Sequence, residues 1–559
     1  MNARDYTIEG TQQPSSDHKR NGTLRREIED LPIGRPREYN VQVMIRVQSC
    51  IKPRKMYRAV FLCQDSILVG DWAHLHDVSG IELLPEAILA LRVLQKSYKI
   101  FMLANYPDRV HEAATSVGVD QLQGHVLNRL AQYGIYIKRI PPSRWAAEGN
   151  IVTRPLPCSL IKAAREYEID VHRSFVISDR PHEIELADQA GARGIYIAGE
   201  RKAQSQLSLT RNCLIAANLW DAALFVMEQD LSQRGQGILP DVEHAAVILR
   251  DGGVVAFPTE TVYGLGANAL DPMAVARIFE IKGRPRFDPL IVHVAALRQV
   301  KDLVTELPEQ AQELMRFFWP GPLTIVLPKS DLVPDIVTAG LPTVAIRMPD
   351  HPIALTLIRK SGVPVAAPSA NLFGHVSPTT ADHVRQQLGD RVDRVLDGGR
   401  CAIGVESTVI SVSGGIATLL RPGGTPLEEI EHVIGPVQRR TKVQATPMSP
   451  GQLPYHYAPR TPLVLKGQNL PEAALRCGLL SFTVPTSAEG FVAVEVLSAA
   501  GDLREAAANL FAALHRLDAM QLDLIVAELV PEVGLGLAIN DRLRRAAQKR
   551  SAVSRQIVG

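Results

Sequence analysis

Hydrophobic and polar positions alternate along the chain in three successive blocks. In the first, from about residue 57 to 230, short apolar runs (AVFL, KIFML, SFVISD and RGIYIAG) are separated by longer amphipathic stretches such as LLPEAILALRVLQKS. Short apolar runs are typical of buried strands, and longer periodic stretches are typical of helices. Strands that alternate with helices usually form a mostly parallel sheet. The first block therefore predicts a Rossmann-like α/β domain.

A second α/β block begins near residue 238. Its runs PLIVHVA, PLTIVLP, TVAIRMP and PVAAPSAN predict strands, and STVISVSGGIATLLRPG predicts a hairpin with its turn at Gly414-Gly415. The segment GGVVAFPTETVYGLG predicts a buried strand followed by a glycine-rich turn. DPMAVARIFEIKG predicts a helix, because Asp271 suits the N-cap, Pro272 the first turn and Gly283 the C-terminal end.

The third block occupies the last hundred residues and predicts a small α/β unit with CGLLSF, FVAVEVL and LDLIVAEL as strands and LREAAANLFAALHRLDAM as a helix. The segment QRRTKVQATPMSPGQLPYHYAPRTP is rich in proline and weakly periodic, which indicates a linker or arm. We therefore expect an α/β multidomain protein with a flexible N-terminal arm (1–50), a first α/β domain (51–230), a second, twisted α/β domain (231–437), a linker or lid arm (438–462) and a C-terminal small α/β domain (463–559).

Composition narrows the class of protein. A chain of 559 residues with 46% hydrophobic and 21% charged residues is typical of several soluble domains, and its formal net charge of +2 creates no overall field that would attract nucleic acid. The six cysteines are scattered singly, so we expect neither a disulfide framework nor a zinc site. No apolar run approaches the roughly 18 residues that a membrane span needs. These features predict a cytoplasmic protein without a membrane partner.

Candidate chemistry gathers in the second block. KGRP places Lys282 and Arg284 two residues apart after a helix, and in an extended segment both would point to one side and form a clamp for a polyphosphate. PSAN places Ser369 and Asn371 at a strand end, where α/β sheets bind ligands. Arg347 ends another predicted strand and is a natural partner for a carboxylate or phosphate. Each motif alone is commonly structural, but together they indicate one site.

The order of these motifs resembles a known family. FPTETVYGLGANALDPMAVARIFEIKGRP, PLIVHV, WPGPLTIVLP, VAIRMP, VAAPSANLFGHVSPT, GVESTVI and LLRPG follow one another from about residue 240 to 436, as in the YrdC-like L-threonylcarbamoyladenylate synthases. SPGQLPYHYAPRTP and the last block are similar to the family's longer form. The resemblance implies that L-threonine, bicarbonate and ATP give threonylcarbamoyl-AMP and pyrophosphate, for the threonylcarbamoyladenosine modification of tRNA.

The resemblance also implies site residues. L-Threonine would be held by Thr261, His293, Arg347, Ala367 and Ser407. The nucleotide would contact Lys282, Arg284, Asp288, Thr324, Ser369, Asn371, Ser377, Arg421 and Tyr457. Of these, Lys282 and Arg284 are the catalytic candidates: the threonine amine, carboxylated by bicarbonate, supplies the attacking group, so the enzyme has to position and neutralise charge and needs no nucleophile.

Two of these positions carry alternatives. A lone histidine in an apolar strand, such as His293, is commonly a core residue, and the resemblance favours the substrate role. Asp288 stands where the family usually has asparagine; it either weakens ATP binding or helps to hold Mg²⁺, and the sequence does not decide between the two.

The expected partners follow from the same resemblance. They are ATP with Mg²⁺, L-threonine, bicarbonate and downstream threonylcarbamoyl transferase proteins, with any tRNA contact indirect. The arm is either a lid or a passive tether. The alternatives are an RNA-binding YrdC-like module, for which the basic C-terminal NDRLRRAAQKR offers a surface, and a bifunctional enzyme with an active N-terminal phosphatase.

The first block resembles haloacid-dehalogenase-like phosphatases, whose first strand ends in a DxDGT turn. Here the turn is CQDSI, so Cys63 replaces the attacking carboxylate and Asp65 remains as the acid. The later motifs are reduced to Ala104-Asn105, an arginine (Arg154) in place of lysine, and SDRPHE with Asp179 and Glu183. The resemblance implies a degenerate, non-hydrolytic domain in which Asp65, Asp179 and Glu183 could form a vestigial Mg²⁺ site.

Overall fold

The computed structural model of the protein describes residues 56–63, 67–69, 82–103, 116–140, 145–147, 150–152, 157–199, 213–234, 237–439, 451, 453, 456–468 and 476–548. The expected N-terminal arm (1–50), Asp65, Ala104-Asn105, Arg154 and much of the linker (438–462) lie outside the described residues.

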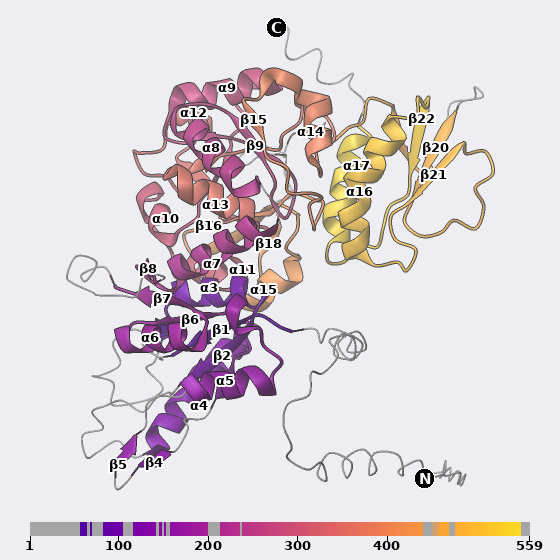
Figure 1. The fold of residues 1–559 in the computed structure, drawn as a ribbon. Coiled ribbons are helices and arrows are strands. Elements are labelled where there is room, and N and C mark those ends of the chain that lie inside the picture. The colour runs from indigo at the N-terminus through magenta and orange to yellow at the C-terminus, as the bar shows by residue number, and fades with distance from the viewer. Residues whose placement is uncertain are drawn as a thin grey trace, which may run out of the picture. The chain divides into compact units, whose positions relative to one another are not determined.

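A six-stranded parallel sheet forms the first block, in the order β3-β2-β1-β6-β7-β8 (Figure 1). Its strands are β1 (Ala59–Leu62), β2 (Lys99–Leu103), β3 (Lys138–Ile140), β6 (Phe175–Ser178), β7 (Arg193–Ile197) and β8 (Leu214–Ala216). The accompanying helices are α3 (Pro85–Leu94), α4 (Ser116–Gln132), α5 (Pro157–Glu166), α6 (Pro181–Ala190) and α7 (Leu219–Arg234), with a 3₁₀ turn at Val171–Arg173 and a two-stranded sheet of β4 (Trp145–Ala147) and β5 (Asn150–Val152).

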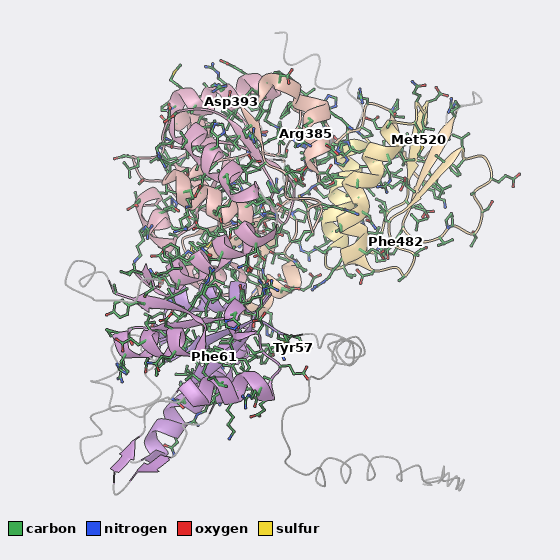
Figure 2. All side chains as sticks on the ribbon, in the orientation of Figure 1. Tyr57, Phe61, Arg385, Asp393, Phe482 and Met520 are labelled. Carbon is green, nitrogen blue, oxygen red and sulfur yellow. The ribbon has the colours of Figure 1, made fainter. Side chains whose placement is uncertain are left out.

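The parallel sheet confirms the strands predicted from the apolar runs. All four residues of β1 are buried, including Phe61, which is labelled in Figure 2. The Phe61 ring stacks on that of Phe101 in β2, with the centroids 5.3 Å apart. A strand buried on both faces needs a continuous apolar run, which is the pattern that AVFL supplies. The boundary expected at residue 230 falls inside α7.

A ten-stranded mixed sheet forms the second block, in the order β15-β9-β10-β14-β11-β13-β12-β16-β17-β18. The strands are β9 (Val255–Phe257), β10 (Gly264–Asn268), β11 (Ile291–His293), β12 (Leu323–Pro328), β13 (Thr343–Arg347), β14 (Val365–Ala366), β15 (Arg394–Val395), β16 (Thr408–Ser413), β17 (Ile416–Arg421) and β18 (Gln438–Arg439). The helices are α8 (Ile238–Arg250), α9 (Pro272–Lys282), α10 (Leu297–Leu303), α11 (Glu309–Phe318), α12 (Asp335–Thr338), α13 (Pro352–Ser361), α14 (Ala381–Leu388) and α15 (Leu427–Ile434), with a 3₁₀ turn at Gly389–Arg391.

Local signals in this block are confirmed with one exception. The Asp271 side chain accepts the backbone N–H groups of Met273 and Ala274, and Gly283 ends α9 with φ +60°. The segment expected to be a glycine-rich turn is instead the strand β10, in which a Cβ at Gly266 would lie 2.7 Å from Phe257. Glycine therefore allows close packing here and does not mark a turn.

The C-terminal block is a four-stranded parallel sheet in the order β19-β22-β20-β21. It consists of β19 (Leu463–Leu465), β20 (Cys477–Ser481), β21 (Ala493–Val496) and β22 (Leu524–Ala527), with the helices α16 (Leu503–Asp518) and α17 (Gly536–Ala546) (Figure 1). This confirms the predicted third α/β unit. Of the helices that the structure describes, none is long and apolar enough to cross a membrane.

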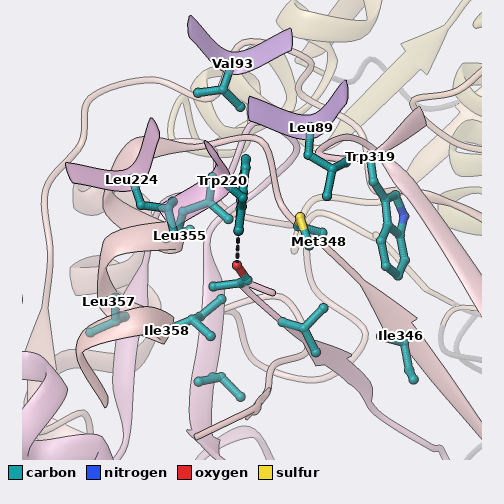
Figure 3. Close-up of a cluster of buried hydrophobic side chains, with 14 of the residues drawn as sticks. Leu89, Val93, Trp220, Leu224, Trp319, Ile346, Met348, Leu355, Leu357 and Ile358 are labelled. Carbon is teal, nitrogen blue, oxygen red and sulfur yellow. Dashed lines mark hydrogen bonds between the residues drawn. The ribbon is translucent and has the colours of Figure 1, made fainter. Parts of the chain in front are cut away.

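The first and second blocks share one hydrophobic core. A single cluster of buried side chains runs from Val60 in β1 to Val437, which precedes β18. Figure 3 shows part of it, with residues from α3, α7, α13 and the strands of the central sheet. The indole N–H of Trp220 in α7 donates to the carbonyl of Ala295 (2.6 Å), so the polar atom of this buried ring is satisfied inside the core.

Candidate functional site

A pocket lies in the central block and is lined by polar side chains from several strand ends. The lining includes nine residues that the sequence predicts for the site, which are Thr261, Arg284, His293, Arg347, Ala367, Ser369, Ser407, Arg421 and Tyr457. The structure thus brings together residues that lie up to 196 positions apart in the chain, from Thr261 to Tyr457.

The register of the central sheet explains why these side chains meet. His293 at the end of β11 is paired with Arg347 at the end of β13. Strand β12 runs antiparallel to β13 with Ile325 opposite Ile346, so Thr324 lies opposite Arg347. Thr324 is in turn paired with Val409, and Val409 with Arg421. Residues in register on neighbouring strands point to the same face of a sheet. One row across the sheet therefore supplies two arginines, a histidine and a threonine.

Arg347 is held by three different groups. Its Nε donates to the carbonyl of Gly321 (3.2 Å), its Nη1 donates to Oγ1 of Thr261 (2.9 Å), and its Nη2 lies 2.6 Å from Oε1 of Glu260. The Arg347 side chain is only 4% exposed. A guanidinium has five N–H donors, so this arginine keeps donors for a further acceptor while its plane is fixed.

His293 is buried beside Arg347, and its ring meets Phe257 edge-on with centroids 6.1 Å apart. Burial, together with the positive charge of Arg347, lowers the pKa of His293 to about 3. The ring is therefore neutral near pH 7, and its Nδ1 has no hydrogen-bond partner within the described part of the chain.

Lys282 and Arg284 do not form the clamp that the sequence suggested. Lys282 is the last residue of α9 and Gly283 is left-handed, so the segment is not the extended one that the sequence suggested. The Nζ of Lys282 donates to the carbonyls of Ser369 and Asn371, which ties the PSAN segment to the helix end. Burial, together with the nearby charge of Arg284, lowers the Lys282 pKa well below its usual value. Lys282 thus supports the cavity wall from behind.

Arg284 reaches the cavity and also forms a buried ion pair with Asp288 (2.9 Å). Its guanidinium donates to the carbonyls of Asp288 (3.2 Å) and Pro289 (2.9 Å). The Asp288 side chain is fully buried, and burial raises its pKa even though Arg284 opposes the shift. The unusual carboxylate therefore faces Arg284.

Arg421 and Ser407 form another part of the pocket wall, and Thr324 contacts Ser407. The Nη2 of Arg421 donates to the Ser407 carbonyl (2.8 Å), and the hydroxyls of Ser407 and Thr324 are 2.7 Å apart. Thr324 thus acts behind Ser407. Asn371 is held in the same supporting way, because its Nδ2 donates to the carbonyls of Leu372 (2.7 Å) and His375 (2.9 Å).

The described residues of the arm enter the cavity. Gly451, His456 and Tyr457 line it, and the Tyr457 ring is 5.9 Å from that of Phe511 in α16. The Tyr457 hydroxyl is buried without a hydrogen-bond partner among the described residues. Gly451 has φ +78°, and a Cβ there would lie 2.3 Å from the Tyr457 hydroxyl. Only glycine therefore allows the backbone at this position to pack against Tyr457.

Two charged residues at the pocket wall lie in segments that the sequence singled out, but neither was assigned a role in the site. Glu406 lines the cavity, accepts a hydrogen bond from Ser377 (2.5 Å) and pairs with Arg542 of α17 (2.8 Å). Arg542 is 1% exposed, although NDRLRRAAQKR suggested a solvated basic face. No local signal reveals this contact, because 136 positions separate the two residues. His456 also lines the pocket. The sequence assigned only its neighbour Tyr457 to the site, although both belong to the HYAP motif.

A second pocket is lined by residues of α3, α7 and the segment after α3, together with Asp350 and Pro352, and Cys63 is not part of its lining. Cys63 is 1% exposed, and burial, then the charges of Glu183 and Asp179, raise its thiol pKa well above the usual value. Glu183 is fully buried and accepts a short hydrogen bond from the hydroxyl of Ser178. No cluster of three or more metal-ligating side chains occurs in the part of the chain that the structure describes.

Comparison with known proteins gives two family matches. Residues 247–423 match the family described as Telomere recombination, and residues 425–548 match the Threonylcarbamoyl-AMP synthase, C-terminal domain. The two matches cover the central and C-terminal blocks.

Similar proteins cover the same region. The Threonylcarbamoyl-AMP synthase of Bacillus subtilis is 48% identical over 322 residues, which are 55% of this chain and 93% of that protein. The enzyme of the same name from Pyrococcus abyssi is 48% identical over 318 residues, 54% of this chain and 93% of that one. The crystal structure of P. abyssi Sua5 complexed with L-threonine is 46% identical, with a TM-score of 0.52, covering 55% of this chain and 94% of that chain. Because nearly the whole length of these relatives is matched at this identity, the chain belongs to the threonylcarbamoyl-AMP synthase family.

Proposed function

We infer that the protein is an L-threonylcarbamoyladenylate synthase, a nucleotidyltransferase that makes threonylcarbamoyl-AMP for the modification of tRNA. The observation that carries this inference is the pocket that Arg284, Arg347 and Arg421 line together with serine and threonine hydroxyls, in a chain of this family. Cations and hydroxyls of this kind suit a triphosphate and an amino-acid carboxylate.

The reaction needs no nucleophile from the protein. The amine of threonine and bicarbonate form a carbamate and release water; a carbamate oxygen then bonds to the α-phosphorus of ATP, and the bond to pyrophosphate breaks. Charge develops on the phosphates during this step. Fixed cations in a site screened from water stabilise that charge far more than mobile ones in solution. The chain's task is therefore to orient two substrates and to neutralise phosphate charge.

Arg347 is proposed to hold the carboxylate of threonine. Arg347 lines the pocket, and its guanidinium, already fixed by Gly321, Thr261 and Glu260, keeps further N–H donors. His293, neutral next to it, offers a ring nitrogen for the threonine amine or hydroxyl without adding charge. Thr261, Ala367 and Ser407 complete this subsite in the proposal.

Arg284, Ser369, Arg421 and Tyr457 are proposed to meet the nucleotide. Lys282, Thr324, Asn371 and Ser377 would support it from behind, through Ser369, Ser407 and Glu406. Mg²⁺ would enter with ATP, because this ion is commonly bound through substrate phosphates and keeps several waters. Transferase proteins that consume the product are the proposed downstream partners.

The RNA-binding alternative is less well supported. An RNA backbone needs exposed cations, whereas Lys282, Arg284, Arg347 and Arg421 are each at most 6% exposed. In the basic C-terminal helix, Arg542 pairs with Glu406 and Arg545 pairs with Asp541. We therefore propose only indirect tRNA contact.

For the first block we propose a degenerate haloacid-dehalogenase-like domain that does not hydrolyse phosphate esters. Its parallel sheet and the buried Cys63 after β1 support this proposal. A vestigial Mg²⁺ site at Asp65, Asp179 and Glu183 stays a proposal, since Asp65 lies outside the described residues. Cytoplasmic location is proposed as well, because none of Cys63, Cys213, Cys401 and Cys477 is in a disulfide.

Pyrophosphate release tests the synthase function. The full-length protein with ATP, L-threonine and bicarbonate should release pyrophosphate, and omission of any one of the three should stop the release. Pyrophosphate release that continues without threonine would show a different nucleotidyl transfer and would contradict the proposal.

A further inference from the structure

Helix α3 of the first block contacts the segment that leads into the central strand β12. The guanidinium of Arg92 donates from Nη2 to the carbonyl of Arg316 (2.6 Å) and from Nη1, through a short hydrogen bond, to the carbonyl of Trp319. Arg316 lies in the last turn of α11, and Trp319 follows directly after that helix. Carbonyls at a helix C-terminus lack intrahelical partners, and a cation there is favoured by the helix dipole. Arg92 thus caps α11 from another domain.

The segment that Arg92 holds also contacts the cavity arginine. Two residues after Trp319, the carbonyl of Gly321 accepts from Nε of Arg347 (3.2 Å), and the N–H of Gly321 donates to the carbonyl of Met348 (2.9 Å). The indole N–H of Trp319 donates to Leu323 (2.8 Å), which starts β12. Hydrogen bonds on both sides of Gly321 therefore leave little freedom to this segment.

Close packing also restricts the segment between Trp319 and Gly321. A Cβ at Gly321 would lie 2.2 Å from the carbonyl oxygen of Phe318, so the turn is tightly closed. Figure 3 shows Leu89 and Val93 of α3 in one cluster with Trp319 and Met348. Close-packed side chains transmit a displacement because few voids can absorb it.

A second contact, from the segment just after α3, reaches the chain that follows Arg347. Lys96, just after α3, forms an ion pair with Asp350, three residues after Arg347. The first block therefore contacts the chain both before β12 and after β13. Neither contact belongs to the cavity lining.

We propose that the first domain positions the threonine subsite, and that Arg92 is a positioning residue that acts on Arg347 through the carbonyl of Trp319 and through Gly321, two residues further on. The proposal rests on the proposed function and deepens it: it assigns to the fused domain a role in binding the carboxylate-bearing substrate. Arg92 touches no substrate. It fixes the segment that fixes the plane of the guanidinium.

Steady-state kinetics of full-length variants test the proposal. Arg92→Met removes both hydrogen bonds but keeps much of the aliphatic packing, and we expect KM for L-threonine to rise by roughly three- to tenfold, the usual scale of coupling between contacting networks. KM for ATP should change less than twofold, because Arg347 holds the amino acid. Arg92→Lys restores one donor and should recover part of the threonine KM.

Arg359→Met is the matched control. Arg359 in α13 also crosses to the first block, where it pairs with Glu228 and lies 4.8 Å from the Phe225 ring centroid. Within the described part of the chain it forms no hydrogen bond or ion pair with the segment before β12. This variant should lower Tm to a similar extent and leave both KM values unchanged.

The outcomes separate this inference from the proposed function. Wild-type protein without pyrophosphate release would defeat the proposed function itself. An active wild type in which Arg92→Met leaves the threonine KM unchanged, or in which Arg92→Met and Arg359→Met shift it equally, would overturn the positioning role. If Arg92→Met does not fold, Arg92→Lys decides by the same criterion.

Discussion

Asp288 illustrates at the scale of single residues how a charge changes its meaning once its neighbour is known. The sequence predicted a nucleotide contact and left open whether the carboxylate weakens ATP binding or holds Mg²⁺. In the structure it is fully buried against Arg284, a lining residue of the cavity. Asp288 partly cancels the positive charge of Arg284 that the triphosphate would otherwise meet. This favours the alternative in which Asp288 weakens ATP binding.

Asp288→Asn should therefore strengthen ATP binding. Removing one negative charge near a triphosphate is worth about 1 kcal/mol even in water-like screening, so KM for ATP should fall by roughly fivefold. Asp335→Asn, at an exposed carboxylate paired with Lys329, serves as the control. Initial rates over a range of ATP concentrations measure the effect, and a higher KM in Asp288→Asn would support a metal-holding role instead.

His293 predicts a pH dependence of stability. Its folded-state pKa is lowered to about 3, mainly by burial and also by Arg347, from 6.5. Between these values the unfolded chain binds a proton that the folded chain does not, so stability is lost as pH falls from about 6.5 toward 3. The contribution lost from pH 7 to pH 5 is about 2 kcal/mol.

Denaturant unfolding at pH 7, 6 and 5 measures this contribution. His293→Asn should flatten the pH dependence, whereas His432→Asn, at an exposed position in α15, should leave it as in the wild type. An equal slope in wild type and His293→Asn would show that the acid sensitivity arises elsewhere.

Secondary-structure elements differ in how far the sequence predicts them. Helix α9 was predictable because Asp271, Pro272 and Gly283 act within one or two turns of the chain. The same Gly283 contradicts the extended segment expected between Lys282 and Arg284, because its left-handed conformation turns the chain between the two cations. The strand β10 was missed because its glycines are needed for packing against Phe257, a partner from β9 that a turn signal does not reveal.

The arm offers the sharpest prediction at this scale. Tyr457 packs against Phe511 and lies 4.8 Å from the Arg542 guanidinium, while its hydroxyl has no hydrogen-bond partner among the described residues. Tyr457→Phe should leave Tm nearly unchanged. If the hydroxyl binds the nucleotide, KM for ATP should rise about two- to tenfold, the value of one hydrogen bond.

Kinetics and thermal unfolding of the same preparation check this expectation. Tyr136→Phe, at a residue 75% exposed in the first block, controls for loss of a hydroxyl as such. A strong drop in Tm of Tyr457→Phe would assign the hydroxyl to stability, and an unchanged KM would favour the passive tether over the lid.

At the scale of the whole molecule, the sequence indicated three α/β blocks but not how they are joined. The alternation of apolar runs predicted the parallel sheets because burial on both faces leaves a local signature. The core shared by α3, α7 and α13 leaves no such local signature. Each helix would have the same apolar pattern if it packed only within its own domain. The site was predictable as a set of motifs, but the supporting contacts of Lys282, Glu406 and Arg542 required the tertiary structure.

The first domain should not act as a phosphatase. The full-length protein with Mg²⁺ and a panel of phosphate monoesters should release no phosphate above background, because Cys63 is buried and its thiol pKa is raised by burial and by Glu183 and Asp179. In the native protein, iodoacetamide should modify the partly exposed Cys477 well before Cys63. Mg²⁺-dependent turnover of any ester would refute the degenerate interpretation.

Isotope incorporation into the product tests the central claim most directly. The full-length protein is incubated with ATP, L-threonine and ¹³C-labelled bicarbonate, and the adenylate product is analysed by mass spectrometry. We predict an adenylate that contains threonine and one labelled carbon, formed together with pyrophosphate. An adenylate that contains threonine without the labelled carbon would contradict the account, because the amino acid would then be activated directly and not as its carbamate.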